Sequence, residues 1–379
     1  MATSSSVTRV ARSPRSSRTP SSTTGWACGS RHPQWPTRTL PASAPAISIW
    51  STMRFTRRCW PIGDSRRRRH MRDFLAVAEQ IVRDEPGLAS CLPVIEKELL
   101  HVEILRAMHQ AGHLRHLTFK GGTCLRLCHG GLRFSEDLDF SGGKTFDNTL
   151  LRDIEEVLRA RIGERYGLEV TVAPPKLAEG RTRSVRRWVA RIVTRPAGSD
   201  ARIGVQRIKL EIDDREAPAD IAPVPVRQRH ALVADDFVPF PIQAASMADI
   251  CSDKMVAYPM SVLTREHPRH RDAWDIAWLT ERLGAATADL AKRAADKVSA
   301  RDLRPRMPEA LRLTAERSGA LIESDGFRAT LLRFIPRDVA IVTVGDPEYR
   351  LRLGETLRAT CAAVLDALGS HDRDRIHSP

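Results

Sequence analysis

The sequence has no run of eighteen apolar residues and no short hydrophobic stretch of the kind found in a secretory signal peptide. A membrane-spanning helix and a secretory leader are therefore not predicted, and we expect a soluble protein. Its cysteines form no paired framework, and they lack the second Cys or His pair that a zinc site needs. Reduced, mostly buried thiols are expected, which indicates the cytoplasm. The seven cysteines are Cys28, Cys59, Cys91, Cys124, Cys128, Cys251 and Cys361.

Residues 1–70 lack lysine and glutamate and contain one acidic residue, Asp64, against thirteen arginines, a net charge of +12. The segment is rich in Ser, Thr, Pro and Ala, and its tryptophans follow no helical or strand period, so it has no core-forming pattern. It is interpreted as a disordered basic tail or as a translated upstream region that precedes a natural start at Met71. We favour the second interpretation. A targeting peptide fits the composition but lacks an amphipathic helical pattern.

The remaining chain is close to neutral. The full sequence of 379 residues has a net charge of +14, which leaves about +2 for residues 71–379. Bulk charge therefore does not favour nucleic-acid binding by the folded part, and any such contact would need a local basic patch.

Apolar periodicity predicts an α+β fold with a mixed sheet, in which a core of about residues 115–245 precedes a helical domain. We divide the chain into an extension (1–70), a core with lead-in helices (71–245) and a helical C-terminal domain (246–379). Helical spacing is found over 71–84, 93–110, 148–165 and 247–259, where Pro259 is expected to end the helix. Strand patterns are found over 117–119, 137–141, 168–172, 188–194, 205–212 and, weakly, 231–240.

The segment from Lys120 to Phe140 carries the strongest chemical signal. Gly121, Gly122 and Thr123 follow a strand pattern, and a glycine pair lets backbone amides close around a phosphate. Asp137 and Asp139 then alternate with Leu138 in the next strand pattern, so both carboxylates face the same side. Two oxygen donors beside a phosphate-binding loop suit Mg²⁺ carrying a nucleoside triphosphate. This pattern predicts a site for nucleotidyl transfer.

A third carboxylate is predicted from the strand pattern at 205–212. Alternation places Arg207, Lys209 and Glu211 on the polar face of this strand. If the strand lies beside residues 137–141, Glu211 can complete a two-metal site, since two cations need more anionic ligands than one pair supplies. A solvated charged face is the alternative.

Two helical segments add candidate residues. Lys254, after Asp253, could hold a triphosphate as a point charge, although a single lysine is more often a surface residue. Asp272 and Asp275 are spaced i,i+3 and share one helical face. Asp272 could instead be the N-terminal cap of its helix. The sequence leaves open which of these two aspartates is functional.

These segments together resemble the successive motifs of the AbiEii/AbiGii-type toxin nucleotidyltransferases over about residues 90–285. The matching motifs are Val94-Ile95-Glu96-Lys97-Glu98, Lys120-Gly121-Gly122-Thr123, Arg133-x-Ser135-x-Asp137-Leu138-Asp139-Phe140, Lys209-Leu210-Glu211, Asp253-Lys254 and Arg271-Asp272-x-x-Asp275. Glu98 departs from the aspartate that relatives commonly have there.

The resemblance implies a polymerase-beta-like core with a helical C-terminal domain, and the toxin of a bacterial toxin–antitoxin or phage-defence system. Two Mg²⁺ ions, an NTP substrate, a tRNA 3′-end acceptor and an antitoxin encoded nearby are implied as cofactor and partners. Asp137 and Asp139 would bind metal, with Glu211 as the third ligand. The nucleotide would be held by Lys120, Gly121, Gly122, Thr123, Ser135 and Lys254. Lys254, Asp272 and Asp275 would join the aspartates as catalytic residues.

Other functions remain compatible with the same core. These are nucleotidyl transfer to a protein or a small molecule, and a catalytically inactive nucleotide-binding regulator. The sequence does not identify the NTP or the acceptor. Residues 181–195, with six arginines and Trp188, are the best candidate for a tRNA-facing patch, because phosphate contacts beside a stacking aromatic suit a 3′ end. A solvated strand face explains this pattern equally well.

Overall fold

The computed structural model describes residues 73–176, 185–194, 204–214, 218, 220–234, 237–284 and 287–376. Residues 68–379 form one compact unit. The expectations for residues 1–70 lie outside the described part of the chain. The α+β prediction is confirmed, because a seven-stranded mixed sheet is combined with helices along most of the chain.

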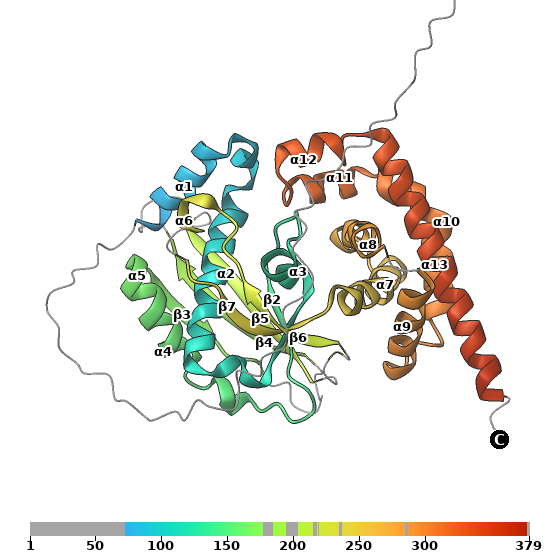
Figure 1. Cartoon of the computed structure of the whole chain (residues 1–379), viewed down its shortest axis with the longest axis horizontal. Helices are drawn as coiled ribbons and strands as arrows, with labels where there is room; N and C mark the ends of the chain where they lie inside the picture. Colours follow the sequence, from blue (N-terminus) through green and yellow to red (C-terminus); the bar gives the residue numbers. More distant parts are fainter. Residues whose placement is uncertain are drawn as a thin grey trace, which may run out of the picture. The chain divides into compact units, whose positions relative to one another are not determined.

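The helical elements begin before the sheet and continue to the end of the described chain (Figure 1). They are α1 (Phe74–Asp84), η2 (Pro86–Cys91), α2 (Leu92–Ala111), η3 (His113–His116), α3 (Gly121–His129), η4 (Asn148–Leu151), α4 (Ile154–Leu158), η5 (Arg159–Gly163), α5 (Glu164–Tyr166), α6 (Ala231–Ala234), α7 (Met247–Thr264), α8 (His270–Leu283), α9 (Thr287–Ala300), α10 (Met307–Glu323), α11 (Asp325–Leu332), α12 (Arg337–Val342) and α13 (Pro347–Ile376).

The strands are β1 (Thr118–Lys120), β2 (Leu138–Ser141), β3 (Glu169–Ala173), β4 (Val185–Val193), β5 (Val205–Asp213), β6 (Ile221–Val226) and β7 (Phe240–Ala245). Their order in the sheet is β3-β4-β5-β2-β1-β7-β6. The short central strands β1 and β2 are antiparallel, whereas β2 runs parallel to β5. The two predicted motif strands therefore lie side by side in the middle of the sheet.

One hydrophobic core includes residues of the sheet, of the helices that precede it in the sequence and of the helices that follow it. α2 packs against β5, and its Glu96 accepts a hydrogen bond from Gln206 Nε2 at 2.7 Å. Even-numbered β5 residues such as Ile208 and Leu210 are fully buried, which confirms the predicted alternation of this strand. The odd-numbered residues of β5, including Glu211, lie on the opposite face of the strand.

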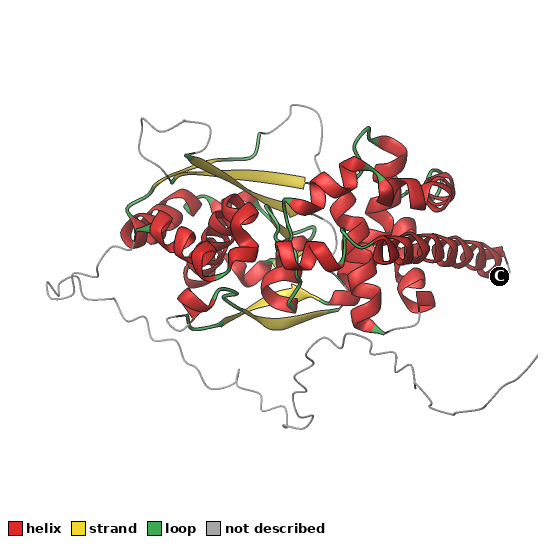
Figure 2. Cartoon of the chain, turned by 90° about the horizontal axis from the view of Figure 1, so that it is seen from above, coloured by secondary structure: helices red, strands yellow, loops and turns green. Residues whose placement is uncertain are grey.

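The helices from α7 to α13 gather at one end of the sheet, away from α1, α2, α4 and α5 (Figures 1 and 2). α7 packs against α8, α9 and α10, and α10 packs along α13. α8 also contacts the loop between α3 and β2 through side chains described below. No helix of the described chain is long and apolar enough to span a membrane.

Three predicted elements differ in the structure. The helix expected over 148–165 is divided among η4, α4, η5 and α5, with a π-helical segment at Arg159–Gly163. The weak strand expected over 231–240 is wrong, because residues 231–234 form α6 and the strands lie on either side of it. The helix end expected at Pro259 is also wrong, since α7 continues to Thr264.

Candidate active site

Two glycines let α3 begin directly beside the aspartates of β2. Gly121 has a φ of +77°, which favours glycine, and a Cβ there would clash with the Asp139 carboxylate. A Cβ on Gly122 would lie 2.7 Å from the Ser135 hydroxyl and 2.8 Å from the Arg133 guanidinium. No side chain caps α3, so its first backbone N–H groups lack intrahelical partners next to these residues. Such a helix start favours a phosphate group.

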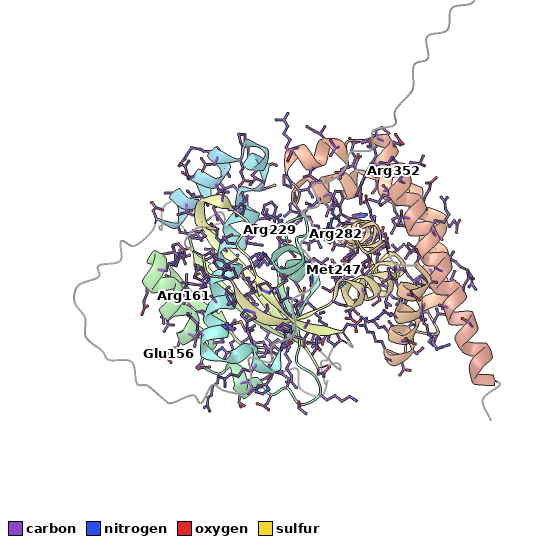
Figure 3. All side chains as sticks on the ribbon, viewed as in Figure 1. Glu156, Arg161, Arg229, Met247, Arg282 and Arg352 are labelled. Carbon is purple, nitrogen blue, oxygen red and sulfur yellow. The ribbon has the colours of Figure 1, made fainter. Side chains whose placement is uncertain are left out.

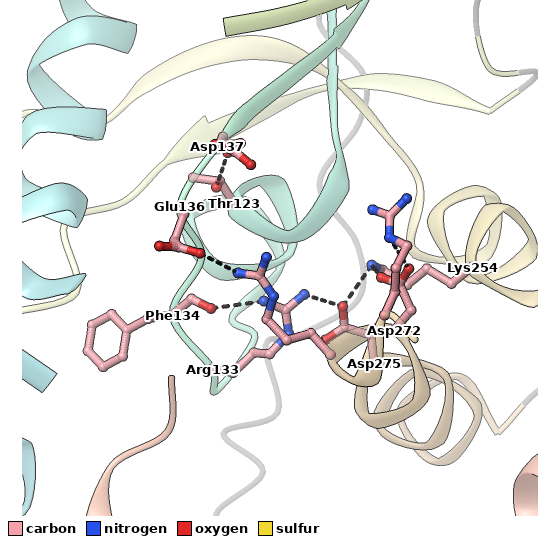
Figure 4. A network of polar contacts seen from close by, with 10 residues as sticks. Thr123, Arg133, Phe134, Glu136, Asp137, Lys254, Asp272 and Asp275 are labelled. Carbon is pink, nitrogen blue, oxygen red and sulfur yellow. Dashed lines mark hydrogen bonds and ion pairs between the residues drawn. The ribbon is translucent and has the colours of Figure 1, made fainter. Parts of the chain in front are cut away.

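The Thr123 side chain has a different position from the one predicted. It is buried, and its hydroxyl donates a hydrogen bond to the backbone carbonyl of Asp137 at 2.5 Å (Figure 4). This bond connects α3 to the start of β2. In this structure Thr123 therefore holds the two motif segments together, and its hydroxyl does not face the cleft described below.

The candidate metal ligands lie on adjacent strands. Asp139 of β2 stands opposite Glu211 of β5 in their parallel register, so the predicted adjacency of the two strands is confirmed. Arg187 Nε donates to Glu211 Oε1 at 2.6 Å, and Lys209 Nζ lies 3.5 Å from Asp137 Oδ1. Cations on the same face of the sheet thus balance part of the carboxylate charge.

The charge of these carboxylates fits a divalent cation. Burial, with the negative charges of Asp137 and Glu211, raises the pKa of Asp139 to about 6. Burial also raises the pKa of Asp137. Among the residues that the structure describes, no three Asp, Glu, His or Cys side chains converge on one metal position. The Asp137–Asp139 pair therefore fits a hard cation, and Glu211 would join it only after leaving Arg187.

A cleft of about 420 Å³ opens between this part of the sheet and helices α7 and α8. It has both acidic and basic sides, and several of its residues were not singled out from the sequence. Its lining consists of Lys120, Gly121, Asp139, Phe140, Val185, Glu211, Asp213, Ile250, Asp253, Lys254, Ala257, Arg265, Arg269, Asp272 and Arg301. Of the predicted site residues, Lys120, Gly121, Asp139, Glu211, Lys254 and Asp272 lie here.

Lys254 is held by two aspartates of α8. Its ammonium donates to Asp272 Oδ1 at 2.7 Å and lies 2.8 Å from Asp275 Oδ2 (Figure 4). All three side chains are buried. Burial alone opposes the charge of Lys254, but the two carboxylates raise its pKa overall. Lys254 is therefore a fixed positive charge at the edge of the cleft.

The two aspartates of α8 have different surroundings. Asp272 lines the cleft, and its second oxygen lies 2.9 Å from Arg269 Nε. The interpretation of Asp272 as a helix cap is wrong, because α8 begins at His270 and Arg269 is its N-cap residue. Asp275 is outside the cleft lining and accepts two hydrogen bonds from the Arg133 guanidinium, one of them from Nε at 2.6 Å. Asp275 thus joins Arg133 to Lys254.

Glu136 makes a second connection between the motif loop and the helices. Its carboxylate accepts from Lys97 Nζ at 2.9 Å and from Arg271 Nη1 at 3.2 Å. Its backbone carbonyl lies 3.0 Å from His101 Nε2. The loop at residues 133–136 is therefore attached to both α2 and α8, and we call these contacts the 133–136 network.

The predicted tRNA patch is only partly described. Arg181, Arg183 and Arg195 lie outside the described residues. The expectation that Trp188 stacks on a base is wrong, because its side chain is buried and packs edge-on against Phe146. Strand alternation explains the difference, since Trp188 lies on the core face of β4.

Two cleft residues were missed for different reasons. Asp213 forms an ion pair with Lys120 at 2.5 Å, and continuing the alternation of β5 by two residues beyond Glu211 would have found it. Arg301 follows α9 and forms an ion pair with Asp253. No local pattern around Arg301 indicates this role, because only the packing of α9 on α7 brings it to the cleft.

An α+β core that sets paired carboxylates opposite fixed cations in one cleft is the arrangement of a nucleotidyltransferase. A family model described as nucleotidyl transferase AbiEii toxin, type IV toxin–antitoxin system, matches residues 103–340. The match covers more than half of the chain, and the protein belongs to this family of toxin nucleotidyltransferases. Membership implies an NTP substrate, a divalent metal and an antitoxin partner.

Solved structures give a more distant similarity. MenT4, a nucleotidyltransferase toxin from Mycobacterium tuberculosis H37Rv, is 20% identical, with 76% of this chain and 89% of that chain covered and a TM-score of 0.48. JHP933 from Helicobacter pylori is 22% identical, with 75% and 99% covered and a TM-score of 0.39. No curated protein matches the sequence.

Proposed function

We propose that this enzyme is a cytoplasmic toxin that transfers a nucleotide from an NTP to the 3′-terminal hydroxyl of tRNA, using Mg²⁺. The observation that carries the proposal is the position of Asp139, which lies opposite Glu211 and faces a cleft whose other side holds Lys254. The type IV toxin–antitoxin family supports a cognate antitoxin as partner, and a role in phage defence is part of the proposal.

Binding of the triphosphate is assigned to three features of the cleft. The uncapped start of α3 offers backbone N–H groups, and Lys120 and Lys254 offer ammonium groups. Arg269, a half-exposed residue at the cleft that is paired with Asp272, is the third. These cations neutralise a ligand that carries several negative charges.

Asp137 and Asp139 would hold Mg²⁺, with Glu211 as a further ligand for a second ion. When bound there, the ion would supply a lower pKa for the attacking hydroxyl and positive charge to neutralise the leaving pyrophosphate. The chain itself contributes positioning. Asp272 and Asp275 keep Lys254 charged and fixed, so that it need not reorganise when charge develops on the phosphates.

The direct test is incubation of the purified protein with each labelled NTP, Mg²⁺ and total RNA. Label in the tRNA band, lost in Asp137→Ala, supports the proposal. Label in protein or in a small molecule would overturn the tRNA assignment. NTP binding without any transfer would indicate a nucleotide-binding regulator.

A further inference from the structure

Four basic side chains lie exposed on one face of β4 and β5. Strand alternation puts the odd-numbered residues of β5 on the same face as Glu211, and the register places those of β4 beside them. Because Glu211 is paired with Asp139, this face is continuous with the candidate metal ligands. We call it the basic sheet face, and its members are Arg187, Arg191, Arg207 and Lys209.

Two of these arginines oppose each other directly. Arg191 of β4 is the register partner of Arg207 of β5, and like charges in such a pair destabilise a sheet. Arg191 Nη1 lies 4.0 Å from Glu169 Oε1, which is a long distance for an ion pair. The pair is therefore poorly compensated by the described protein groups, and a bound anion would relieve the repulsion.

The spacing of the face suits a chain of phosphates. Along β5, Lys209 is two residues and Arg207 four residues from Glu211, or roughly 14 Å at about 3.4 Å per residue. This length is sufficient for contacts with more than one phosphate of the same strand. Lys209 already lies next to Asp137, at 3.5 Å. A strand whose end reaches the aspartates would thus pass Lys209 before it meets the arginine pair.

The chemistry of the face favours phosphates over a protein partner. Apart from its charged residues, the described part of this face on β4 holds Val185, Val189 and Val193 and no aromatic side chain. Protein interfaces are depleted in charge at their centre and enriched in aromatic residues. Arg and Lys side chains on an exposed sheet face donate hydrogen bonds to phosphate oxygens, and such contacts with the backbone carry no sequence information.

We propose that the basic sheet face binds the phosphate backbone of the acceptor RNA, with Arg191 and Arg207 holding nucleotides that precede the reacting 3′ end. This inference rests on the proposed function, because it takes RNA as the acceptor. It implies that this surface contributes affinity without base specificity.

The test compares Arg191→Gln/Arg207→Gln with Arg312→Gln/Arg317→Gln, which removes two exposed charges from α10. The probe is unfractionated tRNA with a fluorescent label, titrated by anisotropy over a range of salt concentrations. The Kd of the β4–β5 variant should rise at least tenfold, and its log Kd–log salt slope should fall by about 1.5 for two lost phosphate contacts. The KM for NTP should stay near that of the wild type in both variants, and the melting temperature of the β4–β5 variant should not fall, because the repulsion between the two arginines is removed.

Unchanged tRNA affinity and salt slope in the β4–β5 variant would overturn the inference, as would an equal loss in the α10 variant. The outcomes distinguish an error in the surface assignment from an error in the proposed function. If the wild-type enzyme labels tRNA and the β4–β5 variant binds it normally, only the surface assignment is wrong. If the wild-type enzyme labels no RNA, the proposed function is wrong as well.

Discussion

At the scale of single residues, Asp139 combines two opposing demands. Burial of its carboxylate, together with the negative charges of Asp137 and Glu211, raises its pKa to about 6. A ligand must nevertheless be ionised to bind a hard cation. The same arrangement that suits a divalent cation therefore destabilises the protein when no cation is bound.

We predict that Asp139→Asn abolishes nucleotidyl transfer without lowering the melting temperature in EDTA. Removal of the charge relieves repulsion from Asp137 and Glu211, while the loss of a metal ligand should reduce the rate at least a hundredfold. The measurements are transfer rate and thermal unfolding with and without Mg²⁺. Added Mg²⁺ should stabilise the wild type more than the variant. Equal stabilisation of both proteins would contradict the assignment of Asp139 as a ligand.

A comparison of one single and one double variant at Lys254 and Asp272 forms the second prediction. Lys254→Met alone leaves two buried carboxylates without their cation and should cost about 3–5 kcal/mol of stability. Lys254→Met/Asp272→Asn removes one of those charges and should recover part of the loss. Both proteins should have at least a tenfold higher KM for NTP. Chemical denaturation and steady-state kinetics measure the two effects, and a normal KM in the double variant would exclude Lys254 from triphosphate binding.

At the scale of elements, α2 and α3 are joined by a buried ion pair. Arg126 Nε donates to Glu98 Oε2 at 2.7 Å, and His230 Nε2 lies 3.2 Å from Glu98 Oε1. Burial opposes the ionisation of Glu98, but Arg126 and His230 lower its pKa to about 2. The departure of Glu98 from the usual aspartate is thus accommodated by a structural pair outside the cleft.

This pair predicts a stability change in acid. Because the pKa of Glu98 is lowered on folding, the ionised pair contributes its full stability above about pH 4.5 and loses it as the pH falls toward about 2. Glu98→Gln should lower the free energy of unfolding at pH 7 by about 3 kcal/mol and by much less near pH 3. Urea unfolding at several pH values measures this difference. A pH-independent effect of Glu98→Gln would contradict the ionic role.

The 133–136 network predicts a kinetic effect of Arg133. Arg133→Lys keeps the positive charge but loses the bidentate contact with the Asp275 carboxylate. Lys254 and the loop beside Gly122 should therefore be held less rigidly. We expect about a tenfold lower kcat. Arg282→Lys is the matched control, since Arg282 is an exposed residue of α8, the helix that carries Asp275 (Figure 3). Rates and melting temperatures should be measured for both. Equal rates for the two variants would show that the network only stabilises the fold.

The sequence patterns predicted those strands and helices that have one buried face. Alternation in β5 and the Asp137–Asp139 pair confirm this at the centre of the sheet. β6 was missed because Pro223 and Pro225 argue against a strand, and prolines are tolerated here only because β6 is an edge strand. The contacts of Arg301 and Arg133 join positions far apart in the chain, and local periodicity contains no information about them.

At the scale of the whole molecule, the described elements all belong to the unit formed by residues 68–379. The core cluster contains residues from α1 to α13, and the family match lies within this unit. The helices that carry Lys254 and Asp272 therefore form one packed body with the sheet that carries Asp139. The site needs both parts of this body.

We predict that deletion of residues 1–70 leaves nucleotidyl transfer within about twofold of the full-length enzyme. These residues show no core-forming pattern and precede the family match at residue 103. Transfer rate and circular dichroism of the two proteins measure the effect. A large loss of activity with unchanged circular dichroism would show that the basic extension contacts the acceptor.

The prolines of β6 also restrict how another chain can join the sheet. Pro225 faces Pro241 of β7, and since neither has an N–H group, this pair is a non-hydrogen-bonded one whose nitrogens point away from the partner strand. Pro223, two residues earlier, has the same orientation. The outer edge of β6 therefore lacks two consecutive donors, which prevents an extended peptide from adding as a further strand there. In the sheet formed by the described strands, the other edge is β3, where strand addition by an antitoxin would meet no such pair of prolines.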